Sequence, residues 1–289
     1  MKLFQSGAAL LGRPGVEKAQ GGRPETGKRR WVLLIVPIIA LLLFWWLMTT
    51  FVLHQQRIYP SPFNVWEELV RIASNEGPLG SPYGHALATL SRLLVAWSIA
   101  FILGTLFGVL AGRFRWFFDF ANSLVWIAMG IPSVVWVFIF LVVFGISDIV
   151  PVSALILLLS APVFIGTAEG VRATSKDLIE MSDSYKATRR QKLFELYLPS
   201  IAPYMASNAR VSFSLGIKIV IIAEVIGLPD GIGLLVRYWS DRLFMGPVVA
   251  WGIILIALGL IADRLVFAPL ERWGRRDPSA SPIRISQVQ

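Results

Sequence analysis

The sequence predicts an all-α polytopic membrane protein with six transmembrane helices and with its N and C termini in the cytoplasm. Hydrophobic residues make up 55% of the 289 residues and charged residues only 16%, whereas about a quarter of the residues of a soluble domain are charged. Six apolar segments can each cross about 30 Å of hydrocarbon. Lysine and arginine gather on one side of these segments, so topology explains the net charge of +9 and no nucleic-acid partner is expected.

The N-terminal part of the chain predicts a tail, an anchor and a surface segment. Residues 1–30 are rich in glycine, proline and basic residues and predict a disordered cytoplasmic tail. Residues 31–53 predict the first transmembrane helix, which is not a cleaved signal because its flank lacks a small-residue cleavage pattern. Residues 54–84 are expected outside the cytoplasm, with a helix on the membrane surface whose apolar stripe includes Val65 and Ile72 and whose opposite face carries Glu68.

Residues 85–269 predict a core of five further transmembrane helices, followed by a cytoplasmic tail over 270–289. Glycines recur every four residues in the second span, which allows a neighbouring helix to approach closely; they are Gly104, Gly108 and Gly112. The third span is expected to kink at Pro132, and the fourth to be broken by Pro151 and Pro162. The six spans are predicted over 31–53, 85–111, 117–144, 149–166, 206–228 and 247–268.

The distribution of basic residues orients these spans. Short cytoplasmic loops carry an excess of lysine and arginine, and here the excess lies in both tails, after the second span and in the loop between spans four and five. The opposite side carries only Arg57, Arg71, Arg237 and Arg242. Both termini and the loop at about 172–204 are therefore expected in the cytoplasm.

The loop at about 172–204 predicts a cytoplasmic helix. Thr174 is expected to cap this helix, with Asp177 three residues later completing a capping box, and Pro199 is expected to end the segment. An amphipathic helix with Tyr185 on one side and basic residues on the other is suited to docking on another protein. The basic residues are Lys186, Arg189, Arg190 and Lys192.

The same loop resembles the signature loop of importer permeases, which opens Glu-Ala-Ala, has glycine at its seventh position and ends Ile-x-Leu-Pro. The corresponding residues are Glu180, Met181, Ser182, Lys186, Leu196, Leu198 and Pro199, and the sequence departs from the pattern at Met181, Ser182 and Lys186. Lys186 replaces the usual glycine, so it must adopt a glycine-like turn at some cost, or the turn must shift.

Four further segments resemble the branch of this family that serves nitrate, taurine, alkylsulfonate and thiamine-precursor uptake, and the resemblance covers roughly residues 59–275. They are Tyr59 to Pro62, Ser91 to Leu93, Ile131 to Ser133, and Ala223 to Gly227 with Gly231 to Gly233. The resemblance implies the type I ATP-binding-cassette importer (MetI-like) permease fold. It also implies a multi-pass protein of the bacterial inner membrane that is a transport subunit and not an enzyme.

The resemblance further implies the partners. The loop would form a coupling helix that seats in a separate ATPase subunit, and that ATPase would bind ATP and Mg, since this chain has no nucleotide-binding loop. A second permease copy, an extracytoplasmic solute-binding protein and membrane lipid complete the expected partners. The expected coupling residues are Glu180, Ser182, Tyr185, Lys186, Arg189, Arg190, Leu196, Leu198 and Pro199.

Charges inside the predicted spans need a partner or water, because an unpaired charge there costs several kcal/mol. Arg92 is one such charge, and Arg210 is near enough to a helix end to snorkel. Lys218 is interpreted as a contact to an anionic substrate, a partner of Glu224 from another helix or subunit, or a group in a water-filled vestibule. Glu224 is interpreted equally as a structural partner or a gate.

The proline of the third span frees a backbone carbonyl, which suits a segment that lines a cavity and equally a simple packing kink. The candidate pathway residues are Pro132, Ser133, Trp136, Lys218 and Glu224. The solute is expected to be small and anionic, such as nitrate, a sulfonate or taurine, or an aromatic or heterocyclic nutrient.

Two other functions are alternatives to the importer permease. An ion-coupled secondary transporter is the main alternative, although internal repeats and acidic groups at mid-membrane are not clear in the sequence. An intramembrane enzyme would need a nucleophile and base or a metal cluster. The chain has no cysteine and only His54 and His85, both at loop edges, so no catalytic residue, metal site or cofactor is expected.

Overall fold

The computed structural model describes residues 27–53 and 55–270, in which helices are the only regular secondary structure. The tail predicted over 1–30 and the tail over 270–289 therefore lie almost entirely outside the described residues, as does His54. The chain first forms α1 (Gly27–Leu47), a π-helical turn (Met48–Val52), α2 (Pro62–Ala73), α3 (Pro82–Arg113), α4 (Arg115–Gly130) and α5 (Ser133–Phe144). It continues through α6 (Ile149–Arg172), α7 (Lys176–Ser184), α8 (Arg189–Gln191), a π-helical segment (Lys192–Tyr197), α9 (Leu198–Gly227), α10 (Ile232–Ser240), α11 (Met245–Ala262) and a last π-helical turn (Asp263–Phe267).

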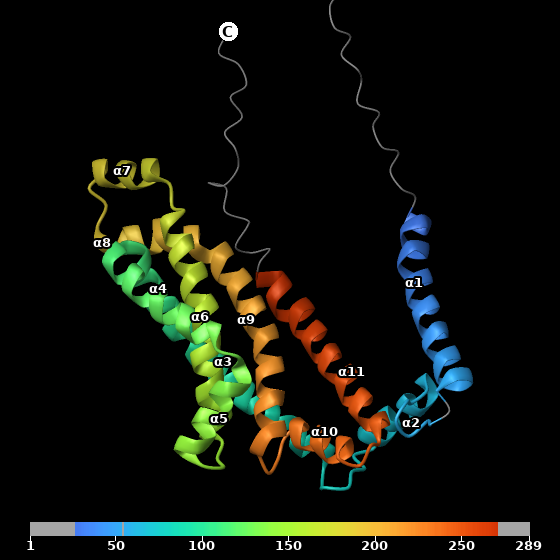
Figure 1. Cartoon of the computed structure of the whole chain (residues 1–289). Helices are drawn as coiled ribbons and strands as arrows, with labels where there is room; N and C mark the ends of the chain where they lie inside the picture. Colours follow the sequence, from blue (N-terminus) through green and yellow to red (C-terminus); the bar gives the residue numbers. More distant parts are fainter. Residues whose placement is uncertain (1–26, 54, 271–289) are drawn as a thin grey trace, which may run out of the picture.

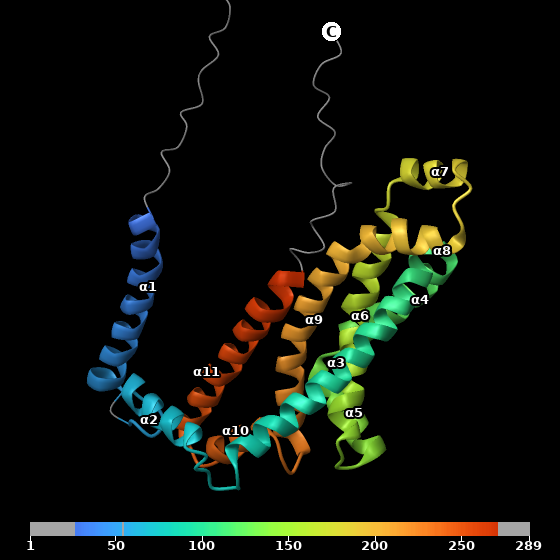
Figure 2. The same ribbon diagram turned by 180° about the vertical axis from the view of Figure 1, so that it is seen from behind.

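Four helical segments of the described chain are long and apolar enough to cross a membrane, and two bent pairs raise the number to as many as six. The four segments are Ile35–Val52, Pro82–Arg113, Ile149–Arg172 and Met245–Leu270. The pair α4 and α5 bends by 94° at Ile131 and Pro132, which is sharper than the predicted kink, and the pair α9 and α10 bends by 57°. Figures 1 and 2 show α7 and the beginning of α1 at one end of the molecule, with α2 and α10 at the other.

The centre of the fold is the close packing of α3 against α6. A Cβ atom on Gly104, Gly108 or Gly112 would lie within 2.8 Å of side-chain or backbone atoms of α6, so these positions admit no side chain. This confirms the helix contact predicted from their four-residue spacing. The main apolar cluster extends from this contact to α9 and includes Leu93, Leu159 and Phe213.

Helix α1 stands apart from this core and joins it through α2. The apolar window of α1 is only 6% buried, and its Trp45 donates a hydrogen bond from Nε1 to the carbonyl oxygen of Pro60 at 3.1 Å. Val65 and Ile72 of α2 pack with residues of α10 and α11. Glu68, which the sequence placed on the polar face, is buried beside Arg71.

Three sequence-based expectations about helix boundaries are wrong. Helix α6 runs unbroken from Ile149 to Arg172, because Pro151 lies in its first turn, where an N–H has no helical partner, and Pro162 is accommodated inside the helix. Pro199 does not end a helix but lies in the first turn of α9. Helix α10 was not predicted, since the turn after the fifth span was expected to lead directly to the sixth.

Candidate functional site

The loop between α6 and α9 projects from the bundle as a separate helix, α7, that lies across the ends of the neighbouring helices (Figure 1). Ser175 is its N-cap residue, and no side chain caps it there; the capping box predicted from Thr174 and Asp177 is therefore wrong. A reciprocal capping box exists after α7, at the beginning of α8 (Arg189–Gln191). The amide of Thr188 donates to Oε1 of Gln191 at 2.9 Å, and the amide of Gln191 donates to Oγ1 of Thr188 at 3.3 Å.

Lys186 forms the turn that the usual glycine would form. Its φ angle is +53°, and the amide of Ala187 donates to the carbonyl oxygen of Ser182 at 3.0 Å across it. This six-to-one bond around a left-handed residue is the usual glycine-based end of a helix. Lys186 therefore keeps the turn of the signature loop in place, at the conformational cost that the sequence implied.

The other predicted coupling residues lie from α7 through α8 and the π-helical segment to the beginning of α9. Tyr185 is 81% exposed, and Glu180 and Arg190 are also exposed. Ser182 is half-buried, and its hydroxyl donates to the carbonyl oxygen of Ile179 at 2.7 Å. Leu196 lies in the π-helical segment and Leu198 and Pro199 open α9, whereas the side chain of Arg189 lies outside the described part of the chain.

An open cavity of about 520 Å³ separates α7 from the beginning of α9. Leu178, Met181 and Tyr185 line it from α7, and Leu196 and Pro199 line it from the other side. The ion pair between Lys192 and Asp183 joins the two walls. The loop thus presents exposed and apolar side chains on α7, and the chain continues from the two ends of α7 into α6 and α9.

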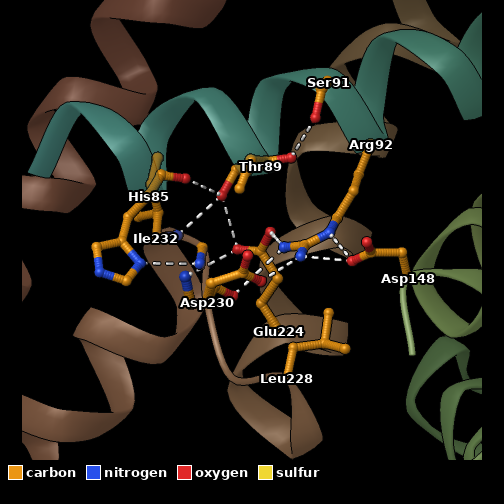
Figure 3. A network of polar contacts seen from close by, with 12 residues as sticks. His85, Thr89, Ser91, Arg92, Asp148, Glu224, Leu228, Asp230 and Ile232 are labelled. Atoms are coloured by element: carbon orange, nitrogen blue, oxygen red, sulfur yellow. Dashed lines mark hydrogen bonds and ion pairs between the residues drawn. The ribbon is translucent and has the colours of Figure 1, made fainter. Parts of the chain in front are cut away.

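At the opposite end of the bundle, one arginine holds three carboxylates together (Figure 3). Nη1 of Arg92 donates to Oε1 of Glu224 at 2.9 Å, and Nε and Nη2 donate to Oδ1 of Asp148 at 2.8 and 2.6 Å. Asp230 accepts from Nη2 through its side chain and from Nη1, at 3.3 Å, through its carbonyl oxygen. All five N–H donors of the guanidinium are therefore used.

Glu224 lies at the centre of this network and has no exposed surface. Its Oε2 accepts from the hydroxyl of Thr89 at 2.8 Å and from the amide of Gly233 at 2.9 Å. A Cβ atom on Gly231 would lie 2.3 Å from its carboxyl carbon, which explains why the turn after α9 needs glycine. Of the two interpretations of Glu224, the geometry gives it structural partners; its role in the pathway stays a prediction.

His85 belongs to the same network, although sequence reasoning assigned it no role. Nδ1 of His85 accepts from the amide of Gly231 at 3.1 Å, so Nε2 carries the proton that it shares with the carbonyl oxygen of Leu79. His85, Thr89 and Arg92 recur at spacings of four and three residues, which places them on one face of α3. This spacing of three polar residues within a predicted apolar span was the sequence signal that could have predicted the site.

The remaining pathway candidates lie around the α4–α5 break and on α9. Trp136 of α5 bridges the break, because its Nε1 donates a hydrogen bond to the carbonyl oxygen of Ala128 in α4 at 3.0 Å. Pro132 is exposed and Ser133 is half-buried. Lys218 is also exposed, and it does not pair with Glu224 in the chain. Arg210, which was expected to snorkel, instead pairs with Asp263, with Nη2 and Oδ2 2.9 Å apart.

Residues 104–270 match the family described as "Binding-protein-dependent transport system inner membrane component". The chain is 28% identical over 211 residues to the glycine betaine/proline betaine permease ProW of Escherichia coli. This match covers 72% of this chain and only 59% of the length of ProW. It is 25% identical over 271 residues to the bicarbonate permease CmpB of Synechococcus elongatus, which covers 89% and 96% of the two chains. The taurine permease TauC of Escherichia coli is 26% identical over 245 residues, with 84% and 89% covered.

Among solved structures, an amino acid ABC transporter "with histidines" has a similar fold, with a TM-score of 0.56 and 21% sequence identity. The likeness covers 66% of this chain and 92% of that one. That structure shares the fold, and the matches to CmpB and TauC confirm the branch of the family that the sequence motifs resemble.

Proposed function

This chain belongs to the family of binding-protein-dependent transport system inner membrane components, and from that premise we propose that it is the membrane-spanning permease subunit of an ATP-binding-cassette importer. Members of the family are transport subunits and not enzymes, and the chain is a multi-pass inner-membrane protein. The proposal includes six spans, with the bent pairs α4–α5 and α9–α10 each counted as one, and both termini in the cytoplasm.

The observation that carries the proposal is the tethered helix α7 followed by the left-handed Lys186. A helix that projects from the bundle, with Tyr185 exposed and Arg190 available to acidic groups, is suited to a cleft on another protein. Because its ends continue into α6 and α9, displacement of α7 would move two spans together. We assign the docking partner as a separate ATPase subunit, which binds ATP and Mg.

The pathway is proposed to form between this chain and a second copy, with an extracytoplasmic solute-binding protein delivering the solute and lipid surrounding the assembly. Pro132, Ser133, Trp136, Lys218 and Glu224 remain the proposed pathway residues. The relatives' names concern bicarbonate, taurine and betaines. The proposed solute is therefore small, either an anion such as nitrate, a sulfonate or taurine, or an aromatic or heterocyclic nutrient.

The test is co-purification of the tagged chain from its native membrane, with mass spectrometry of the accompanying subunits. An ATPase should accompany the wild-type chain, and Arg189→Glu with Arg190→Glu should weaken its retention without changing membrane insertion. Charge reversal at Arg113 and Arg115, at the junction of α3 and α4, is the matched control and should leave retention unchanged. A chain that purifies alone and transports with an ion gradient as its only energy source would contradict the proposal.

A further inference from the structure

Lys218 carries a charge deep in the membrane-spanning part of the chain. It lies nine residues before the end of α9 at Gly227, which corresponds to about 14 Å of helix. Helical side chains tilt toward the N-terminus of their helix, so the ammonium group points away from the nearer end of α9. The side chain is nevertheless exposed. Since an ammonium in contact with hydrocarbon is costly at this depth, this face of α9 must border water or polar groups.

The residues around Lys218 support a polar environment. Ser207, Val211, Ser214 and Lys218 follow one another at spacings of four, three and four residues, which places them on one face of the helix, and all four are exposed. The exposed face of α11 is different, because Ile253, Ile256 and Leu260 make it purely apolar. The α11 face suits lipid, whereas the α9 face combines two hydroxyls with a positive charge.

No carboxylate of the described residues neutralises Lys218. Glu224 is held by Arg92, Thr89 and the amide of Gly233, and Asp263 is held by Arg210. Glu224 and Asp263 are thus each paired with an arginine, and the charge left on the exposed face of α9 is positive. A positive charge in a narrow, weakly polar surrounding attracts anions more strongly than it would in bulk water.

The break in the α4–α5 pair lies at the same depth as Lys218. Leu141 of α5 contacts Gly227 of α9, as shown by the 3.3 Å that would separate it from a Cβ at that glycine. Val137 and Ala223, four residues earlier in each helix, share one apolar cluster. The helices run in the same direction (Figure 1), so Pro132, nine residues before Leu141, lies level with Lys218.

We infer that the face of α9 formed by Ser207, Val211, Ser214 and Lys218 lines a water-filled pathway at the depth of the α4–α5 break, and that Lys218 selects an anion as the solute. This inference rests on the proposed function for the second copy, which would bring a second Lys218 to the same pathway. It narrows the two proposed solute classes to the anionic one.

The absence of cysteine from the sequence allows a direct test. A Ser214→Cys variant of the full chain, in native membrane vesicles, is treated with a negatively charged and a positively charged methanethiosulfonate of similar size. Ser214 lies four residues from both Lys218 and Arg210, so the ratio of the two labelling rates reports on the local potential. The anionic reagent should react faster, and adding Lys218→Gln should lower the anion-to-cation ratio about tenfold, while Lys218→Arg should preserve it.

Two controls define the outcome. Removing the neutral pair with Arg210→Gln and Asp263→Asn should leave the ratio unchanged, and an Ile256→Cys variant on the apolar face of α11 should resist both reagents. If Ser214→Cys resists both reagents, or if Lys218→Gln leaves the ratio unchanged, the inference is overturned. The proposed function fails in a different way. In that case the chain would take up solute without an ATPase, while the labelling of Ser214→Cys would still favour the anionic reagent.

Discussion

Replacing Arg92 by glutamine should destabilise the folded chain more than any other single change in the buried network. Arg92 is 6% exposed and its partner Glu224 is 0% exposed. Without the guanidinium, the carboxylate of Glu224 would remain buried with only the Thr89 hydroxyl and the Gly233 amide as donors. A buried carboxylate that loses its cation loses most of what offsets its desolvation.

The expected magnitudes separate this variant from its neighbours. Removing one partner of a buried ion pair costs about 3–5 kcal/mol, whereas Asp148→Asn, at a side chain that is 75% exposed, should cost about 0–1 kcal/mol. At roughly 2–4 °C per kcal/mol for a chain of this size, Arg92→Gln should lower Tm by about 10 °C and Asp148→Asn by about 4 °C at most. The double variant Arg92→Gln with Glu224→Gln should recover part of the loss, because no buried charge remains.

The assay is thermal unfolding of the purified protein in mild detergent. Thiol-reactive dyes do not report on a chain without cysteine, but 11 tryptophans supply an intrinsic fluorescence signal. All variants are heated at one scan rate, since irreversible unfolding makes Tm depend on that rate. If Arg92→Gln melts within 2 °C of Asp148→Asn, or if the double variant melts below Arg92→Gln alone, the network does not neutralise a buried carboxylate and the reasoning is refuted.

Three further predictions concern other parts of the fold. Gly108→Leu should sharply reduce the yield of folded protein, because even a Cβ there would lie 2.7 Å from Thr167 Cβ. Gly130→Ala should be tolerated, because a Cβ at Gly130 would have no atom within 4 Å. Size-exclusion chromatography of both variants tests this. Lys186→Gly should slow proteolysis of the α7 loop and keep ATPase retention, because glycine relieves a left-handed cost of about 1–2 kcal/mol; faster proteolysis would contradict it. Burial raises the pKa of Glu68 in α2 above its ordinary value, with Arg71 opposing and Glu67 adding to the effect. The stability contributed by protonated Glu68 should be full below about pH 4.3 and lost as pH rises through the raised pKa, and Glu68→Gln should remove this loss from a profile of Tm against pH.

Much of the fold could be predicted because the bilayer acts on local sequence. A span needs a run of apolar residues, and a close helix contact needs small residues every four positions, so the second span and the packing at Gly104, Gly108 and Gly112 followed from neighbouring residues. The left-handed turn was also predictable, because Lys186 stands at a fixed place in the signature loop.

The boundaries were less predictable, because several conformations satisfy the same local pattern. Thr174 and Ser175 are both acceptable N-caps, and in the structure it is Ser175 that precedes the first residue of α7. A proline can end a helix or stand in its first turn, where its missing N–H would have no helical partner, and Pro199 stands in the first turn of α9.

The sequence by itself indicated the all-α membrane fold class, the apolar segments and the place of the loop that resembles the signature loop of importer permeases. The tertiary structure alone decided how the charges inside the spans are compensated. Arg92 and Glu224 are 132 residues apart, and Arg210 and Asp263 are 53 apart. No periodicity links such positions, because an ion pair depends on which helices pack together and at which depth. The same packing left Lys218 exposed, and for that reason its surroundings could be interpreted only after the helices were in place.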